Sequence, residues 1–277
     1  MNAIKTTVLL AALTGLFLGI GFLLGGLVGV IIALVIALAM NFFAYWSSDK
    51  AALKMAGAKE VSMTEQPRLH SMIEEVAAQA GLPKPRVYMV ESETPNAFAT
   101  GRNPEHAAIA VTTGIMGLLT ERELRGVLGH ELGHVKNRDI LTSAIVATIA
   151  GAISMLALIS LFFRSSRGPY AMIGFLVAWI VAPMAAGLIR AAISRTRELQ
   201  ADVTGAEVTH DPEALASALE KLHQGVLARP MEATPMAEAT SHLYIVHPFK
   251  AGGVANLFST HPPIEERVRR LREMVYR

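Results

Sequence analysis

The chain has 277 residues, of which 52% are hydrophobic and only 17% are charged, whereas charged residues make up about 25% of a typical soluble domain. With a mean hydropathy of +0.40, the composition indicates a membrane protein with a soluble part. The net charge of +2 says nothing about partners, and the sequence has no basic run or basic patch interleaved with aromatic residues that would suggest nucleic acid. Cysteine is absent, so disulfides and thiolate ligands are excluded, and any metal ion must be bound by histidine and carboxylate groups.

The stretch from Val8 to Tyr45 contains no charged residue. It is too long for one membrane span of about 20 residues and suits two, with Gly25-Gly26 as the predicted turn. We therefore expect a transmembrane hairpin over residues 1–48. A cleaved signal peptide is the alternative, but its apolar core would be only about 7–15 residues long. The positive-inside rule places both ends of the hairpin in the cytoplasm, because lysines flank both ends: Lys5, Lys50, Lys54 and Lys59.

Residues 49–139 are expected to form the first part of a soluble α/β domain. A helix is predicted from Ser62 to Ala80, because Ser62 and Glu65 have capping-box spacing and Gly81 is a stop signal. Apolar runs and alternation then predict three short strands, at residues 87–90, 96–99 and 106–112.

The sequence HELGH at residues 130–134 places two imidazoles four residues apart. On a helix these positions share one face with Cβ atoms about 6 Å apart, so both rings can bind one metal ion. Thr120 and Glu123 have capping-box spacing and predict a helix that begins before the motif. The alternative is a helix face with two solvated histidines.

Two further charge-free runs, 140–163 and 170–189, predict a second hydrophobic hairpin over residues 140–190. Arg164 and Arg167 lie in the connection and would be on the translocated side if the hairpin crossed fully, against the usual Lys/Arg bias. A shallow or tilted hairpin, or one packed within the protein, is therefore the alternative.

Residues 191–277 are expected to complete the soluble domain. Asp211-Pro212 predicts the start of a helix and Gly225 its end. The stretch 226–259 has little periodicity, which indicates a long loop or a mobile lid near the site. The last helix is expected to begin at Pro263. Its arginines are expected to be solvated or at the membrane surface, opposite an apolar face of Ile264, Val268 and Leu271.

A tetrahedral zinc ion bound by His130 and His134 requires a third protein ligand. Glu198 is the candidate, and Asp202 follows one turn later on the same face of a predicted helix. Asp202 is placed to accept the remaining N–H of a ligating imidazole. Spacing alone leaves the alternative of two solvated carboxylates on an arginine-rich helix.

Three separated motifs resemble the HtpX heat-shock family of membrane-bound zinc endopeptidases, relatives of the CAAX prenyl endopeptidases. They are HELGH, Glu198-x-x-x-Asp202 and the run STHPPIEER at residues 259–267, and the similarity extends from end to end. The resemblance implies an α+β membrane protein: a mainly helical gluzincin-type zinc peptidase domain with a small sheet, plus about four transmembrane helices in two hairpins. It also implies one zinc ion per chain, with Glu131 as general base and the ligands His130, His134 and Glu198.

The same resemblance implies how a substrate is held. Asn96, Ala97, Phe98 and Ala99 resemble the edge strand by which gluzincins such as thermolysin bind an extended peptide, and backbone pairing of this kind requires no particular sequence. Asn96 would add a side-chain hydrogen bond to the substrate main chain; the alternative is a plain turn and strand. His261 is the candidate second donor to the oxyanion. Its rivals are His242 and His247, and the alternative is a structural histidine.

The predicted function is a multi-pass endopeptidase of a bacterial-type inner membrane that cleaves cytoplasmic segments of membrane proteins, chiefly misfolded ones. His134 and Glu198 must meet at one ion, so the hydrophobic insert between them crosses the bilayer an even number of times. Basic residues flank the insert, which places the site on the cytoplasmic side. The expected partners are the lipid bilayer and membrane-protein substrates, without nucleic acid. The alternatives are prenyl-protein processing and an inactive scaffold or chaperone, and the oligomeric state stays unknown.

Overall fold

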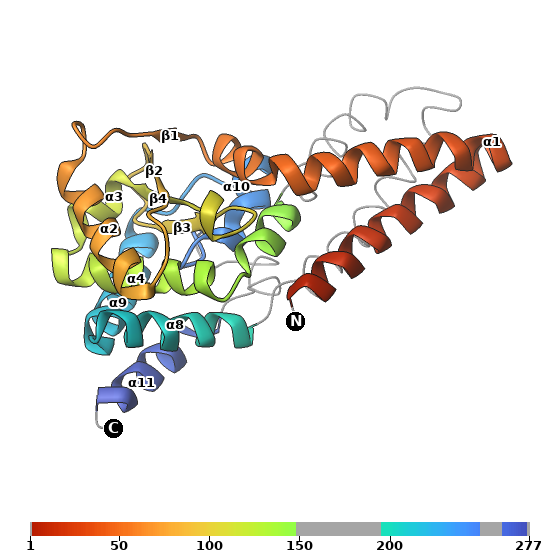
Figure 1. Ribbon diagram of the computed structural model, residues 1–277. Helices are drawn as coiled ribbons and strands as arrows, with labels where there is room; N and C mark the ends of the chain where they lie inside the picture. Colours follow the sequence, from red (N-terminus) through yellow and green to blue (C-terminus); the bar gives the residue numbers. More distant parts are fainter. Residues whose placement is uncertain (1, 148–194, 250–261, 276–277) are drawn as a thin grey trace.

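The computed structural model describes residues 2–147, 195–249 and 262–275, and the description below is limited to them. They form a mainly helical domain around a small sheet, from which a long helical hairpin projects (Figure 1). The two soluble stretches of the sequence, on either side of residues 140–190, pack together in this domain.

The hairpin is α1 (Asn2–Met55), two helices that join at Gly25 and Gly26. The backbone there is non-helical, and Gly26 has a φ of 55°, a conformation that favours glycine. The predicted turn is therefore confirmed. The two arms lie side by side (Figure 1), and Gly21 and Gly29 let them touch, because a side chain at either position would overlap the backbone of the other.

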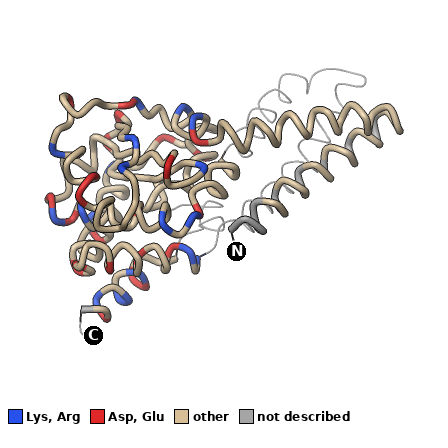
Figure 2. Tube along the Cα trace, in the orientation of Figure 1, with Lys and Arg blue, Asp and Glu red and all other residues tan. Residues whose placement is uncertain are grey.

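The apolar surface of the hairpin is suited to lipid. Its arms carry almost no Lys, Arg, Asp or Glu (Figure 2). Within the described residues, Gly25–Met55 is the one helical segment long and apolar enough to cross a membrane, with a mean hydropathy of 2.7 over an 18-residue window. The helix continues beyond the expected boundary at residue 48 into the domain. Of the predicted second hairpin, only residues 140–147 are described, and they are helical; the rest lies outside the described residues.

The sheet has four strands in the order β1-β2-β4-β3. The central pair, β2 and β4, is parallel, and both outer strands pair antiparallel with their neighbours. Three strands were predicted and are confirmed with ends shifted by one or two residues. The fourth, β1, has three residues and is too short to show an alternating pattern. The strands are β1 (Ala58–Glu60), β2 (Arg86–Val90), β3 (Ala97–Thr100) and β4 (Ala108–Thr112).

The helix α4 lies at the centre of the domain and packs against α2, α8, α9 and β3. Its leucines and valines are buried together with residues of the sheet and of α9, so the core surrounds the helix that carries the HELGH motif. The described helices of the domain are α2 (Pro67–Ala80), α3 (Thr113–Leu118), α4 (Glu121–Lys136), α8 (Arg195–Thr209), α9 (Pro212–Ala228), α10 (Pro235–Thr240) and α11 (Ile264–Val275).

Two helix boundaries differ from the prediction. Ser62 and Glu65 do pair, and Ser62 Oγ donates to Glu65 Oε2 at 2.7 Å, but the pair closes a separate turn before the helix. The helix α2 begins at Pro67. Proline suits this position because the N–H that it lacks would have no partner in the first turn of a helix. Gly225 does not end α9. Gly225 instead lets Pro95 pack closely against α9, because a Cβ at residue 225 would lie 2.6 Å from Pro95 Cγ.

The stretch after α9 is more ordered than the predicted loop. It contains α10 and the 3-10 helix η3 (Ser241–Leu243), followed by a buried segment at residues 244–246. Residues 250–261 lie outside the described residues. The last helix, α11, begins at Ile264, one residue after the predicted start at Pro263.

The start of α4 is fixed by the predicted capping box between Thr120 and Glu123. The Glu123 carboxylate also accepts hydrogen bonds from Ser217 Oγ at 2.6 Å and Lys221 Nζ at 2.8 Å on α9. Burial alone would raise the pKa of Glu123, but the bonds from Lys221, Ser217 and Thr120 outweigh burial and hold the pKa at about 2.

Replacing Glu123 should therefore change how stability depends on pH. Because the folded pKa lies below the usual 4.5, the ionised carboxylate stabilises the fold above about pH 4.5, and this contribution is lost as the pH falls towards 2. We expect Glu123→Gln to lower the free energy of unfolding at pH 7 by on the order of 3 kcal/mol.

Thermal unfolding in detergent between pH 7 and pH 3 measures this dependence. The matched control is Glu121→Gln, an exposed acid in the same helical turn. Equal pH dependence of the native chain and Glu123→Gln would contradict the assignment.

Candidate metal centre

The site is formed where α4 crosses α8 with the two backbones in contact. A Cβ at Gly205 on α8 would lie 2.5 Å from the backbone N of His130, and a Cβ at Gly133 on α4 would lie 2.9 Å from the carbonyl of Ala201. Only glycine permits this approach. The crossing places the first turn of α8 opposite the histidine face of α4.

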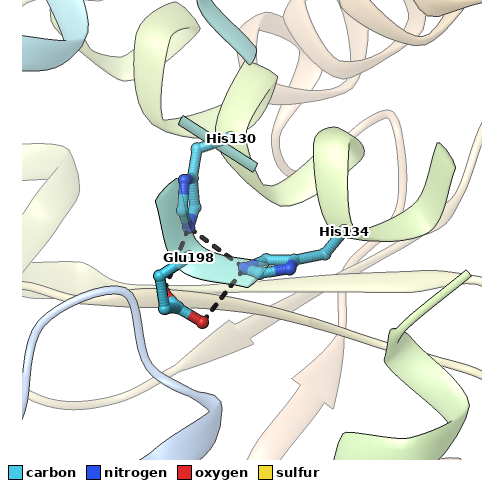
Figure 3. A group of neighbouring side chains, drawn as sticks. All are labelled: His130, His134 and Glu198. Atoms are coloured by element: carbon cyan, nitrogen blue, oxygen red, sulfur yellow. Dashed lines mark hydrogen bonds and ion pairs between the residues drawn. The ribbon is translucent and has the colours of Figure 1, made fainter. Parts of the chain in front are cut away.

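Three side chains converge at the crossing (Figure 3). The Nε2 atoms of His130 and His134 lie 3.1 Å apart. Glu198 reaches both, with Oε2 at 3.8 Å from the first and Oε1 at 3.6 Å from the second. Ligands about 2.0–2.1 Å from a tetrahedral zinc ion lie roughly 3.3 Å from one another. The spacing of the three residues therefore suits one metal ion, as the sequence predicted.

A carboxylate behind each imidazole fixes its orientation. Asp202 Oδ1 lies 2.8 Å from His130 Nδ1, in the predicted place, and Asp139 Oδ2 lies 3.1 Å from His134 Nδ1. Both contacts engage Nδ1 and leave Nε2 directed at the common point. Asp139 was missed in the sequence. Arg138, with a φ of 58°, turns the chain back after α4, and no periodic signal in the sequence reveals such a turn.

Arg267 on α11 supports this arrangement from inside the protein. It is fully buried and donates to both oxygens of Asp202, at 2.8 and 2.7 Å, and to the carbonyl of Ile245 at 2.8 Å. The prediction of solvated arginines on the last helix is wrong for this residue. The sequence spacing could have predicted this burial, because Arg267 lies on the same face of the helix as the apolar residues Ile264 and Leu271.

The charges around the site favour a cation. Burial alone lowers the pKa of both histidines. At His134 the carboxylates of Asp139 and Glu198 outweigh burial and raise the pKa to about 10. The same negative charges attract a divalent metal ion. Two imidazoles and one carboxylate, without thiolate, form a donor set typical of zinc sites that keep an open position.

Glu131 lies beside the converging ligands and is 1% exposed. Burial raises its pKa to about 7, an effect that the charge on His134 opposes. Within the described residues neither carboxylate oxygen has a hydrogen-bond partner. A buried carboxylate with a pKa near neutrality is suited to take and return a proton.

The edge strand β3 runs past Glu131, and part of its outer edge is already occupied. The carbonyl of Ala97 accepts a hydrogen bond from the Ile245 N–H at 3.1 Å. The amide of Asn96 pairs with the backbone of Val246, donating at 2.7 Å and accepting at 3.3 Å. The structure thus uses Asn96 differently from the prediction: its side chain is fully buried and binds a segment of the same chain.

Two other predicted substrate residues have separate environments. The ring of Phe98 packs edge-on against Tyr244, with centroids 5.2 Å apart, and the N–H of Ala99 faces Glu131 and works against the rise of its pKa. His261 lies outside the described residues. Of its rivals, His242 has Nε2 3.1 Å from the carbonyl of Ser143, and His247 packs against Phe249. The identity of the second oxyanion donor stays a prediction.

Three side chains that could hold one metal ion, on two crossing helices with a buried carboxylate and an edge strand beside them, form the arrangement of a metalloprotease. The apolar hairpin includes a helix long enough to cross a membrane. Residues 63–275 match the model of peptidase family M48, and the chain belongs to this family. The resemblance drawn from the sequence is confirmed.

The relatives are similar over their full length. A protease HtpX homolog of Ralstonia pickettii is 54% identical over 99% of this chain and 96% of its own. One from Persephonella marina is 53% identical over 100% of this chain and 99% of its own. Among solved structures, S. mikatae Ste24p has a TM-score of 0.51 at 19% identity. The match covers 97% of this chain and 65% of the Ste24p chain. At this sequence identity the similarity shows a shared fold.

Removing the charge behind His134 should weaken metal binding. Partners of this kind, when replaced, typically cost about 10–100-fold in metal affinity, and we expect Asp139→Asn to fall in this range. The measurement is a competition titration of the purified protein with zinc and a chromophoric chelator. Glu207→Gln, an exposed acid on α8, is the matched control. Unchanged affinity of Asp139→Asn would refute the role of Asp139.

Proposed function

We propose that the protein is a membrane-bound, zinc-dependent endopeptidase that hydrolyses peptide bonds in cytoplasmic segments of membrane proteins, chiefly misfolded ones. The observation that carries the proposal is the convergence of His130, His134 and Glu198 beside the buried carboxylate of Glu131. Membership of a peptidase family supports it.

In this mechanism His130, His134 and Glu198 would hold one zinc ion per chain. When bound, zinc acts as a Lewis acid that polarises the scissile carbonyl and makes water acidic enough to lose a proton near pH 7. Glu131 accepts that proton as the water oxygen adds to the carbonyl carbon. Glu131 then gives the proton to the departing amine as the C–N bond breaks.

Around these groups, other residues set orientation. Asp202 and Asp139 hold the two imidazoles so that their Nε2 atoms stay directed at the metal, and Arg267 holds Asp202. The outward face of β3 beside Glu131 pairs with the substrate backbone, which gives affinity without demanding a sequence.

We further propose a multi-pass topology in a bacterial-type inner membrane, with the lipid bilayer as a permanent partner. The packing of α4 against α8 supports an even number of crossings by residues 140–190, because the two helices flank that stretch and meet on one side. The positive-inside rule supports a cytoplasmic site, because basic residues lie next to the apolar segments: Lys50, Lys54, Lys136, Arg138, Arg190, Arg195 and Arg197.

Two substitutions test the proposed chemistry separately. Glu131→Gln keeps the three ligands but removes the base, so we expect full zinc content and a fall in cleavage rate of about 100-fold or more. Glu198→Ala removes a ligand, so we expect loss of zinc as well as activity.

The assay is cleavage of an unfolded test protein by enzyme purified under chelator and reloaded with zinc, alongside metal analysis. Glu207→Gln is again the control. Equal cleavage by the native chain and Glu131→Gln would refute the mechanism, and retention of zinc by Glu198→Ala would refute the ligand set.

A further inference from the structure

We infer that the protein binds the anionic headgroup of a membrane phospholipid where the apolar hairpin meets the domain. The site is a basic corner, which consists of Lys50 and Lys54 on α1 and Arg102 in the loop after β3. The inference rests on the proposed membrane location of the hairpin and not on the peptidase chemistry. It adds a lipid class to a proposal that so far requires only a bilayer.

The end of the apolar part of α1 marks the level of the lipid headgroups. The side chains of Phe42, Phe43 and Trp46 are exposed there, and exposed aromatic rings at the end of an apolar helix are typical of the membrane interface. The first charged residue of α1 after these rings is Asp49. Trp46 therefore lies close to the level at which lipid phosphate groups are found.

Two lysines continue the row of Trp46 along the helix. Lys50 follows Trp46 by four residues, and Lys54 follows Lys50 by four. Side chains at this spacing are neighbours on one ridge of a helix, and both lysines are exposed. Asp49 does not neutralise them, because its side chain is only 11% exposed and lies 3.0 Å from Arg86 Nη2 on β2. The ridge thus presents positive charge directly beyond the aromatic rings.

A third cation reaches this ridge from the loop after β3. The guanidinium carbon of Arg102 lies over a Trp46 ring, 4.8 Å from its centre, a contact that cation–π attraction stabilises. Arg102 Nη2 also lies 2.6 Å from His106 Nε2, and His106 Nδ1 lies 2.6 Å from Asn103 Oδ1. These contacts hold the guanidinium group one helical turn from Lys50.

No acidic side chain of the chain pairs with the basic corner. Within the described residues, neither lysine nor Arg102 has an ion pair, and Glu105, close to Arg102 in the sequence, has none either. Residues 148–194 and 250–261 contain neither Asp nor Glu, so they offer no acidic side chain. The matching negative charge therefore comes from outside the chain.

A phospholipid matches the ridge at both of its ends. Each Lys or Arg next to a membrane span contributes about fivefold to the affinity for anionic lipid, and phosphate oxygens accept charge-assisted hydrogen bonds from guanidinium and ammonium groups. On the other side of Trp46 the same ridge continues through Phe42 to Leu38, both exposed, where the acyl chains of the lipid can pack. A free phosphate ion would gain only the contacts of the basic corner.

The test compares the lipids that the full chain retains. The protein is reconstituted into bilayers of equal parts phosphatidylglycerol, which is anionic, and phosphatidylcholine, which has no net charge. It is then extracted into mild detergent and washed, and native mass spectrometry counts each lipid bound per chain. We expect phosphatidylglycerol to be enriched about tenfold or more over phosphatidylcholine, because three cations act on its net charge.

Variants separate the basic corner from general attraction to the membrane. Arg102→Gln should lower the enrichment about fivefold, and the addition of Lys50→Gln should bring it close to one. The matched control is Lys59→Gln, an exposed lysine beyond the same helix that already pairs with Glu91 at 3.0 Å, and it should keep the native enrichment. Zinc content, measured alongside, shows that each variant is folded.

Three outcomes would overturn the inference, and one of them reaches further. Equal retention of the two lipids, or native enrichment in the double variant, would refute the lipid site and leave the proposed function standing. Release of phosphatidylglycerol by an excess of inorganic phosphate would assign the basic corner to free phosphate instead. Failure of the native chain to enter bilayers of this composition would refute the proposed membrane location together with the lipid site.

Discussion

The close crossing of α4 and α8 is the constraint on which the site depends. Gly133 on α4 lies against the backbone of Ala201 on α8, and Gly205 on α8 lies against the backbone of Gly129 and His130 on α4. Side chains larger than glycine at the crossing would push the two helices apart and move the carboxylate of Glu198 away from the imidazoles. The glycines therefore determine the spacing of the ligand atoms, and the carboxylates behind the imidazoles determine their direction.

A second set of contacts connects the metal centre to the substrate edge. Asp202 accepts from Arg267 and lies against His130, while Arg267 also donates to the carbonyl of Ile245, whose N–H pairs with β3. Burying an ion pair costs desolvation free energy unless further hydrogen bonds satisfy the charged groups. For the buried pair of Asp202 and Arg267, the contact with His130 and the hydrogen bond to Ile245 supply these further partners. Helix α11, far from α4 in the sequence, thus supports both the ligand and the strand beside it.

The sequence predicted the features that depend on neighbouring residues in the chain and missed those that depend on contacts between distant residues. The Thr120 capping box, the Gly25-Gly26 turn and the HELGH face are local patterns, and all three have the expected geometry. Burial of Arg267 and the return of Asp139 to His134 depend on tertiary packing. Gly225 was taken as a helix stop because the sequence cannot distinguish a glycine that ends a helix from one that admits a neighbour such as Pro95.

The most direct test of this account is the zinc affinity of Gly205→Ala. The added Cβ would lie 2.5 Å from the backbone N of His130, so the helices must separate and the ligand atoms must lose their common point. We predict that a competition titration finds zinc binding weakened by about tenfold or more, as for other changes that misplace a ligand. Gly117→Ala, where a Cβ meets no atom within 4 Å, should bind zinc as the native chain does. Native affinity in Gly205→Ala would contradict the claim that the glycine crossing builds the metal centre.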